Sequence, residues 1–174
     1  MWLKLDLSGI NLSMQIKNYR KTSEEDWLSV WCKTDFSFVA DKWLNYCEDD
    51  SEVFLAREIE DLAKSLDDLL NGRLDAPTEF NCVEPDFNFV LNPKKDLRLD
   101  PKVLYVRPGC EIVDIDMEWK ISFWHDGLTA NYLSVTLDRT DIESLLLYLR
   151  LVMGEVKENA PEIKALMSKG IISD

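Results

Sequence analysis

Three carboxylates at alternate positions, Asp114, Asp116 and Glu118, are the residues of this chain whose types and spacing could do chemistry. Carboxylates that share one face of a strand can hold a hard cation, or can act together as acid and base. The exposed face of a strand also carries such residues when it meets only water or a protein partner. We interpret the three side chains in the second way, as a solvated or partner-binding surface.

The parts of other catalytic sites are missing from the sequence. His125 is the only histidine, and the run His125-Asp126-Gly127 indicates a hairpin turn rather than a general base. The four cysteines form no CxxC pair and the six glycines fall singly, so neither a zinc site nor a phosphate-binding loop is indicated. Glu84-Pro85-Asp86 is a further acidic group, and its position favours a turn. We therefore expect no enzyme activity, no metal and no cofactor, and we expect reduced, mostly buried cysteines.

The strand that positions the carboxylates is the clearest pattern in the chain. From Glu111 to Trp124, apolar residues alternate with residues that are mostly charged. Period-two alternation over this length predicts a β-strand with one dry face and one wet face. The dry face would consist of Val113, Ile115, Met117, Trp119, Ile121 and Phe123. A strand of this kind belongs to an antiparallel sheet that is covered on one side.

Several further strands are predicted by alternation and by turn signals. A polar bend is expected from Lys21 to Asp26, and a break at Pro85, which cannot donate to a strand ladder. The predicted strands are Leu3–Leu7, Ile10–Ile16, Trp27–Lys33, a run from Phe36 toward Tyr46, Phe80–Cys82, Phe87–Leu91, Val103–Val106 and Tyr132–Leu137.

Two helices are predicted, one in each half of the chain. Apolar residues at steps of three and four run from Leu55 to Leu70, and Asn71-Gly72 provides a stop signal. The other face of this helix would be a solvated acidic surface that includes Glu58, Glu60, Asp61, Asp67 and Asp68. Thr140-Asp-Ile-Glu143 predicts a capping box that opens the second helix. The second helix is apolar nearly all round, which indicates deep burial or a subunit contact through Thr140–Met153.

The two halves follow a similar order. Glu58-Ile-Glu-Asp-Leu62 of the first helix aligns with Asp141-Ile-Glu-Ser-Leu145 of the second, and each helix follows about four predicted strands. Shared amphipathic spacing explains this likeness as readily as a true duplication, and we favour the first explanation.

Composition limits the class of protein and of partner. A chain of 174 residues with 46% hydrophobic residues is long enough to bury a core. Its 33 Asp and Glu against 20 Lys and Arg give a net charge of −13, which disfavours nucleic acid and membrane surfaces and favours a basic protein partner. No stretch of about 20 apolar residues is present, and the N-terminus alternates like a strand, so we expect a cytoplasmic protein.

The order of motifs resembles the immunity proteins of wall-associated toxins, the WapI-like family. The likeness extends from about Leu3 to Gly154. It rests on Trp27 and Trp31 before an aromatic strand, the acidic helix Leu55 to Leu70, and Phe80 followed by Glu84-Pro85-Asp86-Phe87-x-Phe89. The resemblance implies a small cytoplasmic bacterial protein that binds and blocks the nuclease end of a contact-delivered toxin. It identifies no toxin-contact residues, and the apolar second helix and the tail after Gly154 depart from it.

The sequence as a whole predicts an α+β protein with an antiparallel sheet of about seven to nine strands covered by two main helices. We expect a single domain over residues 1–154 and a short helical tail over residues 155–174. The expected function is a non-enzymatic immunity protein that covers the active face of a basic nuclease toxin domain. The alternative is a structural or regulatory interaction module that could form a homodimer. Partner-binding residues are expected at Asp114, Asp116, Glu118, Glu58, Asp61 and Asp68.

Overall fold

The computed structural model describes residues 1–23 and 30–174. The expected strand start at Trp27 and part of the expected bend at Lys21–Asp26 therefore lie outside the described residues. The strands are β1 (Trp2–Leu7), β2 (Ile10–Lys17), β3 (Trp31–Ala40), β4 (Leu44–Leu55), β5 (Thr78–Asn81), β6 (Phe87–Asn92), β7 (Lys95–Asp96), β8 (Ile112–Val113), β9 (Asp116–Trp124), β10 (Leu128–Leu137) and β11 (Ile172–Ser173). The helices are α1 (Ala56–Leu70), the 3-10 helix η1 (Leu97–Leu99), α2 (Arg139–Val152) and α3 (Pro161–Ser168).

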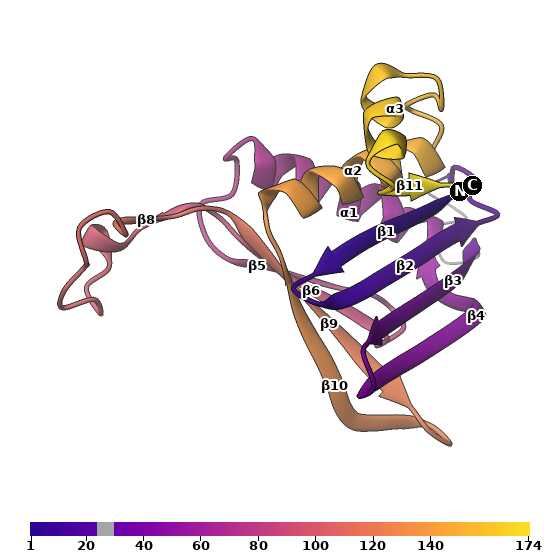
Figure 1. The fold of residues 1–174 in the computed structure, drawn as a ribbon, viewed down its shortest axis with the longest axis horizontal. Helices are drawn as coiled ribbons and strands as arrows, with labels where there is room; N and C mark the ends of the chain where they lie inside the picture. The colour runs from indigo at the N-terminus through magenta and orange to yellow at the C-terminus, as the bar shows by residue number, and fades with distance from the viewer. Residues whose placement is uncertain (24–29) are drawn as a thin grey trace.

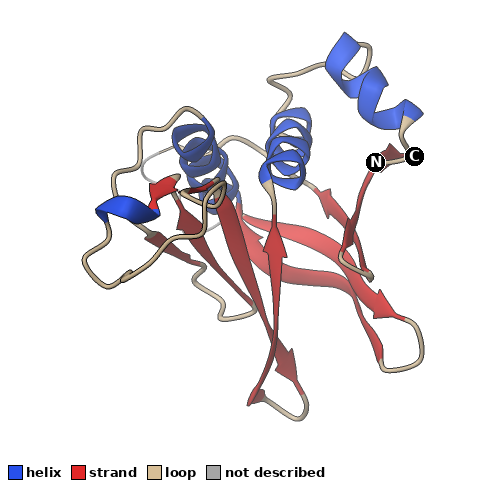
Figure 2. Cartoon of the chain, turned by 60° about the vertical axis from the view of Figure 1, so that its left-hand side comes forward, coloured by secondary structure: helices blue, strands red, loops and turns tan. Residues whose placement is uncertain are grey.

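The described strands form two main antiparallel sheets rather than the single sheet that we expected. One sheet has the order β11-β1-β2-β3-β4 and the other has the order β10-β9-β6-β5. A short pair, β7 and β8, stands apart from both. Figures 1 and 2 show the two main sheets facing each other at an angle, with α1 and α2 along one end. The α+β class is confirmed, and the expectation of one continuous sheet is wrong.

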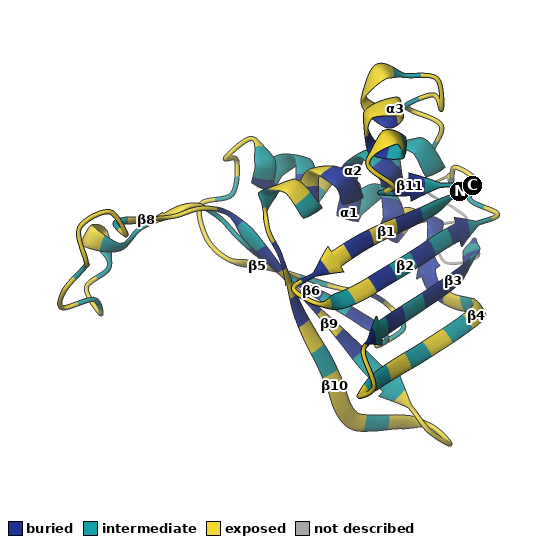
Figure 3. Ribbon diagram, viewed as in Figure 1, coloured by how far each residue is buried: buried dark blue, intermediate teal, exposed yellow. Residues whose placement is uncertain are grey.

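Aromatic side chains join the two sheets. Phe36 on β3 meets Phe87 on β6 with ring centroids 5.0 Å apart, and Phe38 meets Trp119 on β9 at 5.7 Å. All four of these rings are buried. Strands with one apolar face must cover that face, and here each sheet covers the other. Figure 3 shows buried residues alternating with exposed ones along the strands.

Both main helices pack into the same core. The apolar stripe of α1 is buried, and Ile59 and Leu66 have no exposed surface. On α2, Tyr148 is buried and its hydroxyl accepts a hydrogen bond from the backbone N–H of Ile16 at 2.8 Å. The helix contacts α1, α3, β1, β9 and β10. Its nearly all-round apolar surface is therefore explained by contacts within the chain.

The start of α2 differs from the expected capping box at Thr140. Asp138 is the N-cap residue, and its carboxylate accepts hydrogen bonds from the backbone N–H groups of Thr140 at 2.8 Å and Asp141 at 3.0 Å. The carboxylate of Asp141 accepts in return from the N–H of Asp138. The box is present, but two residues earlier than predicted. Thr140 and Asp138 are both good cap residues, and the backbone conformation favours Asp138.

Residues 94–113, which we call the arm, extend away from the body beyond β6 and β9. The arm contains β7, η1 and β8, and it appears at the far left of Figure 1. None of its residues is buried. The strand expected at Val103–Val106 is not formed, and Leu104 is fully exposed there. The long strand expected from Glu111 is divided, because β8 pairs with β7 in the arm while β9 pairs with β6 and β10 in the sheet.

The remaining strand boundaries follow the prediction in part. The strands expected at Leu3–Leu7 and Ile10–Ile16 are confirmed as β1 and β2, which form a hairpin with Ser8 and Gly9 at positive φ of 57° and 91° in its turn. The predicted run from Phe36 toward Tyr46 instead divides into β3 and β4 around a turn at residues 41–43. Strand β4 continues to Leu55, so that α1 follows it directly.

The last residues of the chain join the core. The tail expected to be helical over residues 155–174 contains the helix α3, and β11 pairs with β1 at the edge of the first sheet. Ile163 and Ile172 are buried in the common apolar cluster. This segment is therefore fixed by both packing and strand pairing.

Candidate functional site

The three strand carboxylates have different surroundings. Asp114, at the base of the arm, forms a bidentate ion pair with Arg139, with Nη2–Oδ1 and Nε–Oδ2 distances of 2.8 and 3.0 Å. The guanidinium holds the pKa of Asp114 well below its usual range. Asp116 accepts a hydrogen bond of 2.7 Å from the side-chain amide of Asn92 on β6. Glu118 is exposed on the outer face of the sheet and has no ion pair with another described residue.

This arrangement does not gather a metal site. Within the described part of the chain, no three His, Cys, Asp or Glu side chains lie close enough together to hold an ion. His125 is exposed in the turn between β9 and β10, where its backbone N–H donates to the backbone carbonyl of Gly127 at 2.9 Å. The prediction of a hairpin turn at His125-Asp126-Gly127 is therefore confirmed, with Asp126 and Gly127 at positive φ. The cysteines are free; Cys32 and Cys82 are buried, whereas Cys47 and Cys110 are exposed.

The carboxylates of α1 do not form the solvated acidic face that we expected. Glu58 is buried, and it accepts hydrogen bonds from the backbone N–H groups of Leu55 at 2.8 Å and Val83 at 2.5 Å. Burial raises the pKa of Glu58 above its ordinary value, although these two hydrogen bonds oppose the shift. Its position as the third residue of α1 makes it the acidic member of a helix cap.

The other acidic residues of α1 are paired with arginines. Asp61 accepts from Arg57 at 3.0 Å, and Asp68 accepts from Arg73 at 2.6 Å. Only Arg57 and Lys64 of this helix are largely exposed. No hydrogen bond or ion pair between described residues joins these side chains to the carboxylates of β9. Among the described residues, the six expected partner-binding residues are therefore not joined in one bonded cluster.

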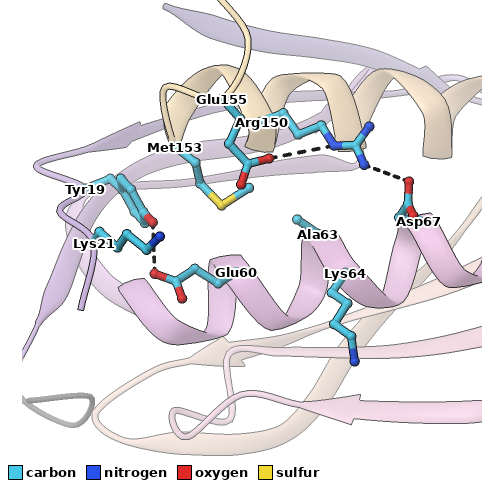
Figure 4. Close-up of a pocket in the computed structure, with 9 residues that line it drawn as sticks. All are labelled: Tyr19, Lys21, Glu60, Ala63, Lys64, Asp67, Arg150, Met153 and Glu155. Carbon is cyan, nitrogen blue, oxygen red and sulfur yellow. Dashed lines mark hydrogen bonds and ion pairs between the residues drawn. The ribbon is translucent and has the colours of Figure 1, made fainter. Parts of the chain in front are cut away.

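A cavity of about 360 Å³ lies between α1 and the end of α2 (Figure 4). Arg150 bridges Asp67 at 2.7 Å and Glu155 at 3.9 Å, and the hydroxyl of Tyr19 donates to Glu60 at 3.0 Å. Burial and the nearby Glu60 raise the pKa of Tyr19. Figure 4 shows Lys64 directed away from Arg150. The charges in this cavity are largely matched, and no nucleophile is paired with a base, so the geometry favours a structural junction over a catalytic site.

A second hollow of about 290 Å³ is more acidic. It is lined by residues of β4, by the turn between β5 and β6, and by Trp124 at the end of β9. Glu52 is paired with Lys33 at 2.9 Å. Burial raises the pKa of Asp86, and the charges of Glu84 and Glu48 act in the same direction. The hollow therefore combines unneutralised carboxylates with an aromatic side chain that is 39% exposed.

Part of this hollow is visible in the sequence, but its position between the two sheets is not. Glu84 and Asp86 stood out as an acidic pair beside a proline, and a turn was the expected role. The structure places them in that turn and also brings them to β4 and Trp124. The pairing of β5 with β6 predicts that Glu84 and Asp86 lie in one turn. The contribution of β4 could not be predicted, because it depends on how the two sheets pack.

Comparison with known proteins identifies a family. The model of the Immunity protein WapI-like family matches residues 4–155, which is most of the chain. The chain belongs to the WapI-like immunity protein family. The matched region contains most of β1, all of β2 to β10, the arm, α1 and α2, whereas α3 and the edge strand β11 lie outside it. No curated protein and no solved structure matches the chain.

Membership of the WapI-like family confirms the resemblance drawn from the sequence. It indicates a role in neutralising a toxin by binding it. Within the described residues, no helix has the length and apolarity that a membrane crossing requires.

Proposed function

We propose that this protein is a non-enzymatic inhibitor that binds a basic nuclease toxin domain in the cytoplasm of a bacterial cell. The observation that carries the proposal is membership of the WapI-like immunity family in a chain with a net charge of −13. A nuclease holds its polyanionic substrate mainly with Lys and Arg. An acidic inhibitor is complementary to that face and can exclude nucleic acid from it.

We propose that the contact region includes the outer face of the β5-β6-β9-β10 sheet and the acidic hollow. Glu118 offers an exposed carboxylate, and Asp116 lies two residues earlier on β9. Asp114, just before β9, is already paired with Arg139, so we assign it a long-range electrostatic role. The hollow adds Glu84 beside the half-exposed ring of Trp124. Aromatic anchors surrounded by charged residues are typical of the residues that dominate binding energy.

The α1 carboxylates are weaker candidates for direct contact. Asp61 and Asp68 are paired with arginines, so a partner that bound them directly would have to displace those arginines. Glu58 serves backbone N–H groups and is buried. We assign Asp61 and Asp68 a long-range electrostatic role and Glu58 a structural one.

The test uses the C-terminal domain of a toxin encoded beside this protein, with RNA and DNA cleavage as the readout. We expect wild-type protein to abolish cleavage near equimolar ratio. Glu84→Lys with Glu118→Lys should weaken inhibition by about tenfold or more, because both charges face the basic partner. Glu158→Lys with Glu162→Lys makes the same change in charge at exposed positions near α3 and is the matched control.

Three results separate the parts of this proposal. Full inhibition by wild type and by the control, with weak inhibition by the first variant, supports both the function and the surface. Equal weakening of both variants would mean that net charge matters but this surface does not. Cleavage that continues at a large excess of wild-type protein would overturn the proposed function.

A further inference from the structure

The arm is charged oppositely to the rest of the molecule. Residues 94–113 contain five Lys and Arg against three Asp and Glu, which gives +2. The remainder of the chain contains fifteen against thirty, which gives −15. A segment that only needed to keep an acidic protein soluble would not require the opposite sign.

The positive charge of the arm is available to a partner. Its three acidic residues are engaged locally: Asp96 with Arg98 at 2.6 Å, Asp100 with Lys95, and Glu111 with the N–H of Gly109 at 2.9 Å. The cationic side chains of the arm that form no hydrogen bond or ion pair with a described residue are Lys94, Lys102 and Arg107. Lys94 and Lys102 act only through their charge, which lowers the pKa of Asp114 and of Asp100. The local anions therefore have bonded partners, while these three cations keep their side-chain donors free.

The arm also presents apolar side chains that the chain itself does not cover. Leu104 is 100% exposed, and Leu99 and Tyr105 are 81% and 77% exposed. Figure 1 shows the arm directed away from both sheets, so the body of the same copy is not placed to cover them. Exposed apolar residues grouped with arginine and tyrosine are typical of protein interfaces.

The sign of the charge selects the partner. A basic toxin domain would be repelled by Lys102 and Arg107, so the surface that fits the arm is acidic. The acidic surface that the structure provides is the body of this chain, with its charge of −15. We propose that the arm docks on the body of a second copy, and that two copies exchange arms in this way.

This proposal agrees with the electrostatics of the whole molecule. Two chains of −13 repel at long range, but at physiological ionic strength that repulsion is screened beyond about 8 Å. Contacts between arm cations and body carboxylates act within that distance. Docking also removes from water the exposed side chains of Leu104 and Tyr105, which we call the apolar tip of the arm. Reciprocal exchange uses the same pair of surfaces twice, as closed two-fold assemblies do.

The test is the mass of the purified full chain in solution, measured by sedimentation over a range of concentrations at physiological ionic strength. We expect a species of twice the 20.2 kDa chain mass. Leu104→Ser with Tyr105→Ser should weaken association at least about tenfold, because it removes the apolar tip. Trp43→Ser removes a large apolar side chain that is 66% exposed in the turn at residues 41–43, and should leave association unchanged.

Charge is tested with a second pair of variants. Lys102→Glu with Arg107→Glu should also weaken association. Lys157→Glu with Lys164→Glu makes the same change at exposed positions outside the arm and should not, since it only makes the body more acidic. Far-ultraviolet circular dichroism is expected to be the same for all variants, because every altered side chain is exposed.

Mixing distinguishes an arm on a body from an arm on an arm. A chain with the altered tip still offers its acidic body, so it should form a mixed dimer with labelled wild type. Absence of the mixed dimer would overturn docking on the body. A wild-type chain that stays monomeric at every concentration, or tip variants that associate as wild type does, would overturn the proposal whether or not toxin inhibition is observed.

Discussion

Glu58 shows how a single residue can have a structural role that its position in the sequence does not reveal. Helical spacing places it on the polar face of α1, where acidic residues are usually solvated. In the structure, the backbone N–H of Val83 lies over the start of the helix and is satisfied by the Glu58 carboxylate. Val83 is 25 residues away in the chain, so no local pattern could have predicted this contact.

Removal of the Glu58 carboxylate should destabilise the protein. Glu58→Ala leaves the N–H groups of Leu55 and Val83 without their acceptor, and we expect a loss of about 2–4 kcal/mol in the free energy of unfolding. Denaturant titration measures the change. Glu143→Ala, at an exposed position in the first turns of α2, is the control and should stay within about 0.5 kcal/mol of wild type. A similar small change for both variants would contradict the assigned role.

The same carboxyl group gives a pH dependence of definite sign. Burial raises the pKa of folded Glu58 above the 4.5 of an ordinary glutamate, so the folded state binds this proton more tightly than the unfolded chain. The stability that this pKa shift contributes is fully present below about pH 4.5, and it is lost as the pH rises through the pKa of Glu58 in the folded state. Relative to Glu58→Gln, which does not titrate, wild type should therefore gain stability as pH falls from 7 to 4.5. A difference in the free energy of unfolding between the two proteins that does not change with pH would contradict the raised pKa of Glu58.

The cap of α2 gives a second prediction for a single residue. Asp138→Ala removes the acceptor for two backbone N–H groups, and we expect it to cost about 1 kcal/mol. Thr140→Ala should cost less than about 0.5 kcal/mol, because the Thr140 side chain caps nothing. Thermal or denaturant melts of the two variants decide between the positions. A larger effect at Thr140 would restore the capping box predicted from the sequence.

At the scale of elements, local patterns predicted strands and helices better than they predicted sheets. Alternation identifies which face of β9 is buried, and Met117, Trp119 and Ile121 are indeed buried. It does not reveal which strands pair or where one sheet ends. The separation into two sheets depends on rings such as Phe38 and Trp119, which are 81 residues apart and meet only in the folded chain.

The candidate site was predictable to a similar extent. The alternation places Glu118 on an exposed strand face, as observed. It gives Asp114 the same status, but Arg139, 25 residues later, pairs with Asp114 at the base of the arm. The arm itself was missed because its apolar residues, such as Val103 and Leu104, resemble a strand in sequence while the structure leaves them without a sheet.

The contact between the sheets should dominate stability at this scale. Phe87 lies within 5.0–5.3 Å of Phe36, Phe54 and Trp119, measured between ring centroids. Phe87→Ala should cost about 3–5 kcal/mol, since it opens a cavity where the sheets meet. Tyr132→Ala, on the exposed face of β10, is the comparison and should cost far less. Equal losses in denaturant titrations would mean that the sheets are not held together by this cluster.

At the scale of the whole molecule, the fold consists of two similar units. Each has a meander of four strands that are neighbours in sequence within the main sheet, followed by a helix: β1 to β4 with α1, and β5, β6, β9 and β10 with α2. Glu58 and Asp141 occupy the same third position of their helices and accept from the corresponding cap N–H. This agreement extends the sequence alignment of the two helices to their structural roles.

The net charge leads to a kinetic prediction for the whole molecule. If a basic toxin domain is the partner, the association rate constant should fall by about tenfold or more between roughly 50 and 500 mM salt, because exposed charges are screened. The free energy of unfolding should change little, since most ion pairs here are at the surface. Stopped-flow binding and denaturant titration at the two salt concentrations measure both quantities. An association rate that is unaffected by salt would refute electrostatic steering.

The division into sequential units also has a consequence during synthesis on the ribosome. Strands β1 to β4 of the first sheet can pair as soon as β4 is made, but Phe36, Phe38 and Phe54 then face rings that have not yet been translated. About 65 residues separate Phe54 from Trp119, which corresponds to about 3–13 s of translation. During that interval the growing chain carries an uncovered aromatic surface. Ribosome pausing before Phe87 should therefore increase chaperone binding and aggregation, whereas pausing after Trp119 should not.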